Sequence, residues 1–360
     1  MATSMISVIA PSFTDPLGYQ IAELPQPVVT ESTDVVIRVH AASINPIDVK
    51  KAAGALKIAV QEEFPYKIGY DCAGVVTEVG SAVTRVHVGD EVYTRLPEVG
   101  RGSWSEYAKC AEYYVALKPE SLSFGDAASL PLAAVTALQA FRKYNGSLEG
   151  KTVFIPAGLS GTGASACQLA KNVFLAGKVI TTVSTAKVGR VPELLGKGVV
   201  DQVIDYTKED VMKVIPQGSV DFIFDTTGEA MRFLSLMTPS TSFIASIATT
   251  PSGNTLQKSS ILRRPNNPQV PWFARMLLNA TDAIRRARAS RWHVEYEYLF
   301  LQPNGVDLDV VTKAVEERKL VPVVGSRVSL HDIDKVREAC GVVYKGKGGI
   351  GKTVIEVVAS

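Results

Sequence analysis

A glycine-rich turn near the middle of the chain has the residue types and spacing that bind a phosphate group. The apolar residues 152–155 predict a strand and residues 164–174 predict a helix, so the turn lies between them. Glycines let a backbone approach a pyrophosphate closely, and a helix N-terminus offers free N–H groups and positive dipole potential. The residues expected to contact a dinucleotide here are Gly158, Ser160, Gly161, Thr162 and Gly163. Because the spacing is Gly-x-x-Gly-x-Gly, an ordinary strand–helix turn is the alternative.

The residues after the next expected strand indicate which dinucleotide would bind. Sites for NAD usually place an Asp or Glu at the end of this strand, about 20 residues beyond the turn. Here the first acidic residue after Gly158 is Glu193, and hydroxyl and basic side chains follow the strand instead: Ser184, Thr185, Lys187 and Arg190. Hydroxyls and cations suit a 2′-phosphate dianion, so NADPH is expected rather than NADH. The alternative is that Lys187 and Arg190 only begin a surface helix.

Alternating strands and helices must hold these residues in place. From about residue 126 the chain alternates short apolar strands, such as 220–224 and 242–247, with helices and short connections. This alternation is typical of an α/β protein with a doubly wound parallel sheet. Residues 1–125 contain closely spaced apolar strands separated by Gly, Pro and Asp, which predicts a β-rich barrel or sandwich. The tail from 321 to 357 is again β-like and is expected to rejoin the first domain.

Residues 254–300 interrupt this alternation. A loop is expected at 263–268, followed by a helix over 273–291 that carries five arginines. We expect this helix to present a solvated basic face to water. Contact with a membrane surface or with an anionic ligand is the alternative.

The composition excludes several classes of protein. The formal net charge is +2, with 46% apolar and 21% charged residues, which is ordinary for a globular protein and unlike a nucleic-acid binder. The four cysteines and four histidines show no zinc-finger spacing. The uncharged windows 152–170 and 233–257 are too rich in Gly, Pro, Ser or Thr for a membrane span, and the first residues lack the basic stretch of a targeting signal. A cytoplasmic protein without a transmembrane segment is therefore expected.

Several segments, in the same order along nearly the whole chain, resemble the medium-chain dehydrogenase/reductase family. They are residues 41–48, 69–76, 88–92, 127–137 and 351–354. The resemblance implies a GroES-like β-rich catalytic domain at 1–125 and a Rossmann domain that binds NADPH at 126–300. It also implies that residues 301–360 return to the catalytic domain.

The resemblance also implies that no metal is bound. The zinc-using enzymes of the family place a Cys where this chain has Asn45, and a His-Glu pair where it has Tyr70 and Asp71. A third ligand position falls near Ala133, and residues 94–103 lack the cysteines of a structural zinc lobe. Alcohol dehydrogenase chemistry would then lack its Lewis acid. Residues 45–48 (Asn-Pro-Ile-Asp) are similar instead to quinone oxidoreductases and to enoyl reductases, including the trans-acting enoyl reductases of fungal polyketide pathways.

The same resemblance implies which residues lie beside the substrate and the cofactor. The candidate catalytic residues are Asn45, Lys50 and Tyr70, with Lys50 as a cation near the enolate and Tyr70 as a donor in the cleft. The alternatives are a surface lysine, a packing aromatic ring and protonation by solvent. The residues placed against the cofactor, besides those of the turn and the second strand, are Pro46, Asp48, Thr136, Tyr206, Ser246, Ile247, Gly348 and Gly349.

The expected function is NADPH-dependent, zinc-independent reduction of conjugated C=C bonds in enones or enoyl groups, with quinones as a further class of acceptor. A secondary-metabolite pathway is the expected setting, and the substrate is a free small molecule or an acyl chain on a carrier protein. The protein is expected to be a monomer or a homodimer. The alternatives are a non-catalytic NADPH-binding protein that acts in trafficking or interaction, and a carbonyl or alcohol oxidoreductase.

Overall fold

Strand β3 (Asp34–Ile44) lies at the centre of the catalytic-domain sheet. In the computed structural model, which describes residues 3–346 and 349–358, it pairs antiparallel with β5 (Asp71–Val79), β7 (Tyr107–Ala111) and β16 (Lys352–Glu356). The strand order is β15-β16-β3-β5-β6-β8, in which the remaining strands are β6 (Glu91–Arg95), β8 (Val115–Leu117) and β15 (Val324–Ser329). Side chains alternate across the sheet, and the alternate residues Val35, Ile37 and Val39 of β3 are completely buried.

The C-terminal tail shares this sheet with the first part of the chain. Thr353 of β16 lies opposite Ile44 of β3, and Ile355 lies opposite Ala42. A smaller sheet of order β2-β1-β4 flanks it, with β1 (Ser4–Ala10), β2 (Gln20–Pro25) and β4 (Tyr66–Lys67). The domain boundary expected at 125 falls within α2 (Phe124–Ala128), and the one expected at 300 falls between β14 (Glu295–Tyr298) and α9 (Gly305–Glu316). Both boundaries stay predictions.

Six parallel strands form the second sheet, as the alternating sequence predicts. They are β9 (Thr152–Ile155), β10 (Lys178–Val183), β11 (Gln202–Asp205), β12 (Phe222–Asp225), β13 (Phe243–Ser246) and β14 (Glu295–Tyr298). Their order is β11-β10-β9-β12-β13-β14, and every pairing is parallel. The strand order reverses between β9 and β12, and ligands of doubly wound sheets bind at the carboxyl ends of the strands at such a point. The expected α/β fold, with a β-rich first domain and a doubly wound parallel sheet, is thereby confirmed.

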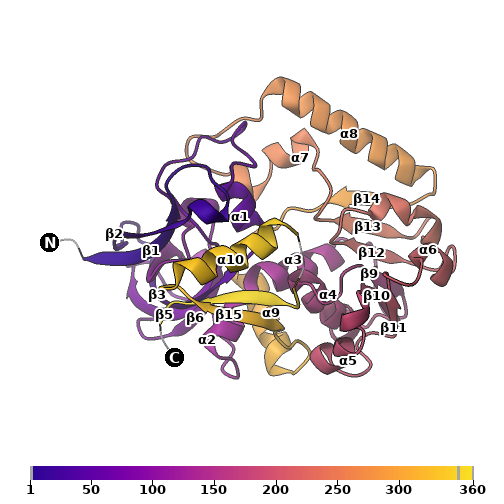
Figure 1. Ribbon diagram of the computed structural model, residues 1–360, viewed down its shortest axis with the longest axis horizontal. Helices are drawn as coiled ribbons and strands as arrows, with labels where there is room; N and C mark the ends of the chain where they lie inside the picture. The colour runs from indigo at the N-terminus through magenta and orange to yellow at the C-terminus, as the bar shows by residue number, and fades with distance from the viewer. Residues whose placement is uncertain (1–2, 347–348, 359–360) are drawn as a thin grey trace.

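Helices connect and cover these strands (Figure 1). The α-helices are α1 (Pro46–Ala52), α2 (Phe124–Ala128), α3 (Pro131–Phe141), α4 (Gly161–Asn172), α5 (Arg190–Leu195), α6 (Val211–Val214), α7 (Gly253–Gln257), α8 (Trp272–Ser290), α9 (Gly305–Glu316) and α10 (Ile333–Tyr344). Short 3-10 turns are η1 (Pro16–Gly18), η2 (Glu98–Gly100), η3 (Glu112–Tyr114), η4 (Thr185–Lys187), η5 (Ala230–Arg232), η6 (Leu234–Leu236) and η7 (Ser260–Leu262).

An aromatic cluster fixes α3 against the parallel sheet. The ring of Phe222, on β12, lies 5.4 Å from that of Phe141 on α3 and is stacked 5.9 Å from that of Phe243 on β13. All three side chains are at most 3% exposed. Burying each of these side chains contributes roughly 1.5–3 kcal/mol to folding. The cluster therefore holds α3 firmly against the parallel sheet.

The segment between β13 and β14 forms α7, η7 and α8, and the helix predicted over 273–291 is α8. Figure 1 shows α8 as a long helix along the outer edge of the molecule, with α7 beneath it. Within α8 only Asp282 and Ala289 are buried. Among residues 3–346 and 349–358, no helix combines the length and the apolar character needed to cross a bilayer.

Candidate dinucleotide and catalytic site

The glycine-rich turn joins β9 to α4 at the point where the strand order reverses. Ala157 has a positive φ of 54°, and a Cβ on Gly158 would lie 2.0 Å from the Thr181 hydroxyl oxygen. A Cβ on Gly163 would lie 2.3 Å from the Ala157 carbonyl oxygen, so only glycine fits there. Ser160 caps α4, because its Oγ accepts a hydrogen bond from the Gly163 N–H at 3.1 Å. A tight turn that leads into a capped helix start fits the pyrophosphate of a dinucleotide.

Ser184 and Thr185 follow β10, where the residues that select the dinucleotide are expected. Thr185 Oγ1 donates to Asp205 Oδ2 at 2.6 Å, and Thr207 Oγ1 donates to Asp205 Oδ1 at 2.6 Å. These hydrogen bonds lower the pKa of Asp205, so its carboxylate stays ionised at neutral pH. Tyr206 is exposed beside the end of β10. The acid beside this site therefore comes from the end of β11 and not from the residues that directly follow β10.

Lys187 and Arg190 have different surroundings. Lys187 Nζ donates to the Gly349 carbonyl at 2.9 Å, so the expected phosphate-binding lysine lies against the returning tail. Arg190 is exposed and forms an ion pair with Glu193, with 2.6 Å between Nε and Oε2. Gly348, which the resemblance also assigned to the cofactor site, lies outside the described residues. The structure thus brings Lys187 and Gly349 together across 162 residues of sequence.

A buried hydrogen-bonded cluster joins the catalytic domain to the glycine-rich turn. Asn45, the N-cap of α1, donates from Nδ2 to Asp71 Oδ2 at 2.9 Å, and its Oδ1 accepts a hydrogen bond from Lys352. Lys352 Nζ lies 3.7 Å from Asp71 Oδ2. Asp71 Oδ1 accepts from the Leu132 N–H at 3.1 Å. Lys352 also contacts the turn, since a Cβ on Gly161 would lie 2.6 Å from its Cδ. An amide, a carboxylate and an ammonium therefore meet beside the dinucleotide turn.

Burial controls the charges of this cluster. Asn45, Asp48, Asp71 and Lys352 are at most 7% exposed. Burial, with the nearby Asp71 carboxylate, raises the pKa of Asp48 to about 7, although Asp48 Oδ2 accepts the Asn45 N–H at 2.6 Å. Burial also raises the pKa of Asp71, and burial lowers the pKa of Lys352; each of these two groups partly offsets the shift of the other. Asp48 is therefore able to change its charge near neutral pH.

Tyr70 is completely buried, which corrects the expectation that it faces the cleft. Its Oη donates to Glu98 Oε1 at 2.8 Å and accepts from Lys51 Nζ at 2.9 Å. Arg264, which lies between η7 and α8, binds Glu62 through both terminal nitrogens at 2.9 and 2.7 Å and reaches Glu98 at 3.0 Å. This ion network ties the inserted segment to the catalytic domain over Tyr70. A role of Tyr70 as a proton donor stays a prediction.

Lys51, rather than Lys50, is the buried lysine of α1. Lys50 is exposed, and its side chain makes no hydrogen bond or ion pair with the described residues. On a helix, residues three apart share a side, whereas residues two apart point in nearly opposite directions. Because Asp48 is buried, Lys51 enters the core, and Lys50 and the first helical residue, Pro46, face outward. Burial lowers the pKa of Lys51, and the Glu98 carboxylate offsets part of this effect.

The residues expected near the nicotinamide lie at the carboxyl edge of the parallel sheet and on α3. Ser246 ends β13, and its Oγ donates to the Asp225 carboxylate at the end of β12, at 2.8 Å. Ile247 follows Ser246, and its N–H donates to the Asp225 carbonyl at 3.1 Å. Thr136 is buried in α3, where its hydroxyl donates to the Leu132 carbonyl at 2.6 Å. Their contacts with a cofactor stay predictions.

Sequence reasoning missed Lys51, Glu98 and Lys352, and it treated Asp71 only as a replaced metal ligand. The spacing of three residues from Asp48 to Lys51 was a signal that could have been used. Lys352 also carried such a signal, because it comes directly after the closely spaced glycines 348, 349 and 351 and immediately before the β-branched residues 353–355. Glu98 carried none, since it lies in a connecting segment 28 residues from Tyr70.

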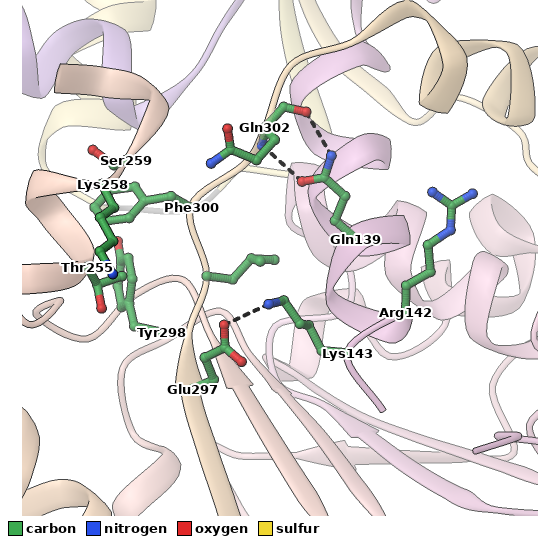
Figure 2. A pocket seen from close by; sticks show the side chains of 11 residues that line it. Gln139, Arg142, Lys143, Thr255, Lys258, Ser259, Glu297, Tyr298, Phe300 and Gln302 are labelled. Carbon is green, nitrogen blue, oxygen red and sulfur yellow. Dashed lines mark hydrogen bonds and ion pairs between the residues drawn. The ribbon is translucent and has the colours of Figure 1, made fainter. Parts of the chain in front are cut away.

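A cavity of about 430 Å³ lies beside the edge strand β14 and is separate from these clusters. Residues at the ends of α3 and α7, residues just after these helices, and residues of the stretch 297–302 line it. They include none of the predicted site residues that the structure describes. Figure 2 shows Gln139 bound to the backbone of Gln302 by two hydrogen bonds, and Lys143 paired with Glu297. These bonds hold the stretch 297–302 against the end of α3. The cavity therefore lies at the edge of the parallel sheet, and we assign it no part in the proposed site.

The residues at the corresponding metal positions do not fit a zinc ion. The Asn45 amide is held between Asp71 and Lys352, and the Tyr70 hydroxyl is held by Glu98 and Lys51. Asp71 is the only one of these three residues that carries a carboxylate, and the Lys352 ammonium already lies beside it. Within residues 3–346 and 349–358, no three His, Cys, Asp or Glu side chains converge as a metal site. We therefore derive no step through a metal.

Comparison with known proteins gives matches along most of the chain. Residues 31–120 match the family described as "Alcohol dehydrogenase GroES-like domain", and residues 200–355 match "Zinc-binding dehydrogenase". The chain is 30% identical to the mitochondrial NAD(P)H oxidoreductase RTN4IP1 of Mus musculus over 92% of its own length and 84% of that protein. It is 38% identical to the chloroplastic NADPH-dependent alkenal/one oxidoreductase of Arabidopsis thaliana, over 60% of this chain and 56% of that protein. The match thus spans little more than half the length of such plant relatives.

A solved structure supports the same relationship. The quinone oxidoreductase from Coxiella burnetii aligns with a TM-score of 0.80 and 28% identity, over 99% of this chain and 100% of that one. The alignment includes both the GroES-like sheet and the parallel sheet. Together with the matches in sequence, it shows that the chain belongs to the medium-chain dehydrogenase/reductase family.

Proposed function

We propose that the protein is an NADPH-dependent, zinc-independent reductase of conjugated C=C bonds in enals and enones. The observation that carries this proposal is the buried cluster of Asn45, Asp71 and Lys352 beside the dinucleotide turn, where the zinc-using relatives bind their metal. When bound, NADPH supplies the hydride that such a reduction needs. The chain's own groups bind the cofactor, orient the substrate and stabilise charge.

Each part of the site has a distinct task in this proposal. The turn from Gly158 to Gly163 holds the pyrophosphate, and Ser184 and Lys187 hold the 2′-phosphate. The ammonium of Lys352 and the amide of Asn45 provide positive potential for the negative charge that develops on a carbonyl oxygen during reduction of an enone. Asp48, whose pKa is raised to about 7, can hold or release a proton near neutral pH. Solvent is the other source of the proton that the α carbon receives.

The relatives support the cofactor and the acceptor classes. The Arabidopsis relative is named as NADPH-dependent and as acting on alkenals and enones, and the Coxiella structure is named as a quinone oxidoreductase. Quinones are therefore included as a second acceptor class. A secondary-metabolite pathway and an acyl chain on a carrier protein belong to the same proposal. The cysteines of the described chain are free and buried, which supports a reducing compartment, and we propose the cytoplasm.

A labelled cofactor tests the proposal directly. NADPH that carries deuterium at its transferable position should place the label on the β carbon of the saturated product of an alkenal, and a chelator should not change the rate. A label on the carbinol carbon would show a carbonyl reductase instead. If alkenals, quinones and acyl thioesters all fail to oxidise bound NADPH, the protein is a non-catalytic binder. Lys352→Met should slow this reduction, and Lys197→Met, which changes an exposed lysine outside the proposed site, is its matched control.

A further inference from the structure

Helix α8 exposes several large apolar side chains along one face. Positions three, four and seven residues apart share one face of a helix, and the residues spaced in this way on α8 point away from the protein. Their exposed fractions are 74% for Trp272, 54% for Phe273, 63% for Met276, 67% for Leu277 and 61% for Ile284. We call these five residues the apolar row. Scattered exposed apolar residues are normal, but a row along one helix face marks an interaction surface.

The opposite side of α8 attaches the helix to the protein. Leu278 and Ala274 pack against a small apolar cluster that includes Leu256 of α7, and Asp282 and Ala289 are buried. Figure 1 shows the helix along the outer edge of the molecule, above α7 and the end of the parallel sheet. The helix is therefore fixed in position, and the rest of the described residues leave its apolar row largely exposed.

The charges that α8 exposes to solvent are all basic. Residues 272–291 contain five arginines and a single acid, Asp282, which is buried and paired with Arg286 at 2.7 Å. At the C-terminal end of the helix, Arg288 and Arg291 line a cavity of about 240 Å³ together with Arg232, Ser235 and Trp292. Arg291 follows Ile284 by seven residues, so it continues the face of the apolar row. The exposed side of the helix thus offers apolar and basic groups without an acid between them.

From this arrangement we propose that α8 docks on an anionic membrane surface, a role separate from the proposed reductase activity. The apolar row enters the boundary between headgroups and acyl chains, and the arginines at its C-terminal end bind lipid phosphates. The 19 residues of α8 make a ridge about 28 Å long that projects from the protein. A lipid surface accommodates a projecting ridge, whereas a protein partner would need a matching groove. In a symmetric dimer formed through α8, the arginines of one copy would face α8 of the other copy, which has no free acid to pair with them.

Vesicle sedimentation of the full chain tests this proposal. We expect the protein to bind vesicles of phosphatidylcholine and phosphatidylserine in equal amounts, to bind pure phosphatidylcholine at least about tenfold more weakly, and to be released by salt. Trp272→Ser combined with Leu277→Ser should weaken binding by at least about tenfold, because two apolar side chains no longer enter the boundary region. Arg288→Gln combined with Arg291→Gln should remove most of the preference for phosphatidylserine. Leu17→Ser changes a side chain that is 76% exposed outside α8 and should bind like the unmodified protein.

Three results would overturn the proposal. One is that the unmodified chain binds neither kind of vesicle. Another is that the α8 variants bind as well as Leu17→Ser does. The third is a dimer in sedimentation velocity that Trp272→Ser with Leu277→Ser converts to a monomer, because a second copy would then be the occupant of the apolar row. Circular dichroism and NADPH binding of each variant separate loss of docking from loss of folding, and neither depends on the reductase assay.

Discussion

Lys352→Met isolates the contribution of the cluster that joins the two domains. In the native protein the Lys352 ammonium donates to Asn45 and lies 3.7 Å from Asp71, and the side chains of Lys352 and Asp71 are 7% and 0% exposed. Methionine keeps most of the volume and removes the charge. The Asp71 carboxylate would then be buried without its counter-ion, while keeping the hydrogen bonds from Asn45 and from the Leu132 N–H.

The expected loss of stability follows from that uncompensated charge. Removing one partner of a buried ion pair costs about 3–5 kcal/mol, and we expect about 3 kcal/mol because Asp71 keeps these hydrogen bonds. The loss should shrink at low pH. Burial already raises the pKa of Asp71, and without Lys352 that pKa rises further, so the carboxyl group becomes neutral as the pH falls and no longer needs a counter-ion.

Urea unfolding of a double-mutant cycle measures this effect. Lys352→Met, Asp71→Asn and their combination are compared with the native protein at neutral and at acidic pH. Combining Asp71→Asn with Lys352→Met should restore part of the stability lost in Lys352→Met alone, because no buried charge then remains. The reasoning is refuted if the losses of the two single variants simply add, or if Lys352→Met is equally destabilising at both pH values.

Three other predictions concern the dinucleotide turn, the choice of cofactor and Asp48. Gly163→Ala places a Cβ 2.3 Å from the Ala157 carbonyl oxygen, so thermal unfolding should show a loss of about 1–3 kcal/mol and titration should show weaker NADPH binding. Lys187→Ala removes one charge-assisted contact of roughly 1.5–3 kcal/mol, so the KM for NADPH should rise tenfold or more while that for NADH changes little; equal changes contradict the assignment. For Asp48, whose folded-state pKa is raised from 3.8 to about 7, the stabilising effect is complete below about pH 4 and disappears as the pH rises through 7. The stability of Asp48→Asn, measured by urea unfolding, should therefore fall less than that of the native protein over this interval.

The features that could be predicted from the sequence are those coded by neighbouring residues. The strand, turn and helix around Gly158 follow from apolar periodicity and glycine spacing, and the six parallel strands follow from repeated alternation with helices. Ser184 and Lys187 stay predictions, and the sequence could suggest them because they lie a short distance beyond the same turn. In each case the physical cause acts over a few residues, so the sequence displays it directly.

The buried cluster around Asn45 and the ion network over Tyr70 depend on contacts between distant segments, and the sequence does not display such contacts. Lys352 reaches Asn45 across 307 residues, and Arg264 reaches Glu62 across 202. The choice between Lys50 and Lys51 required knowing which side of α1 is buried. That side is decided by the packing of the short helix against the rest of the domain, and a helix of seven residues has too few positions to reveal it by periodicity.

For helix α8, too, the sequence could not show which side packs against the protein. Its sequence has apolar residues on two sides, with Ala274 and Leu278 on one side and Met276 and Leu277 within the apolar row on the other. The arginines alone favoured a solvated basic face, because periodicity cannot tell which of two apolar sides packs against the protein. Once α7 occupies one side, the other must remain exposed or bind a partner. Exposure of the large side chains and the absence of a free acid on the helix together favour an anionic lipid surface. The sequence shows neither directly, because the burial of Asp282 and its pairing with Arg286 are visible only in the structure.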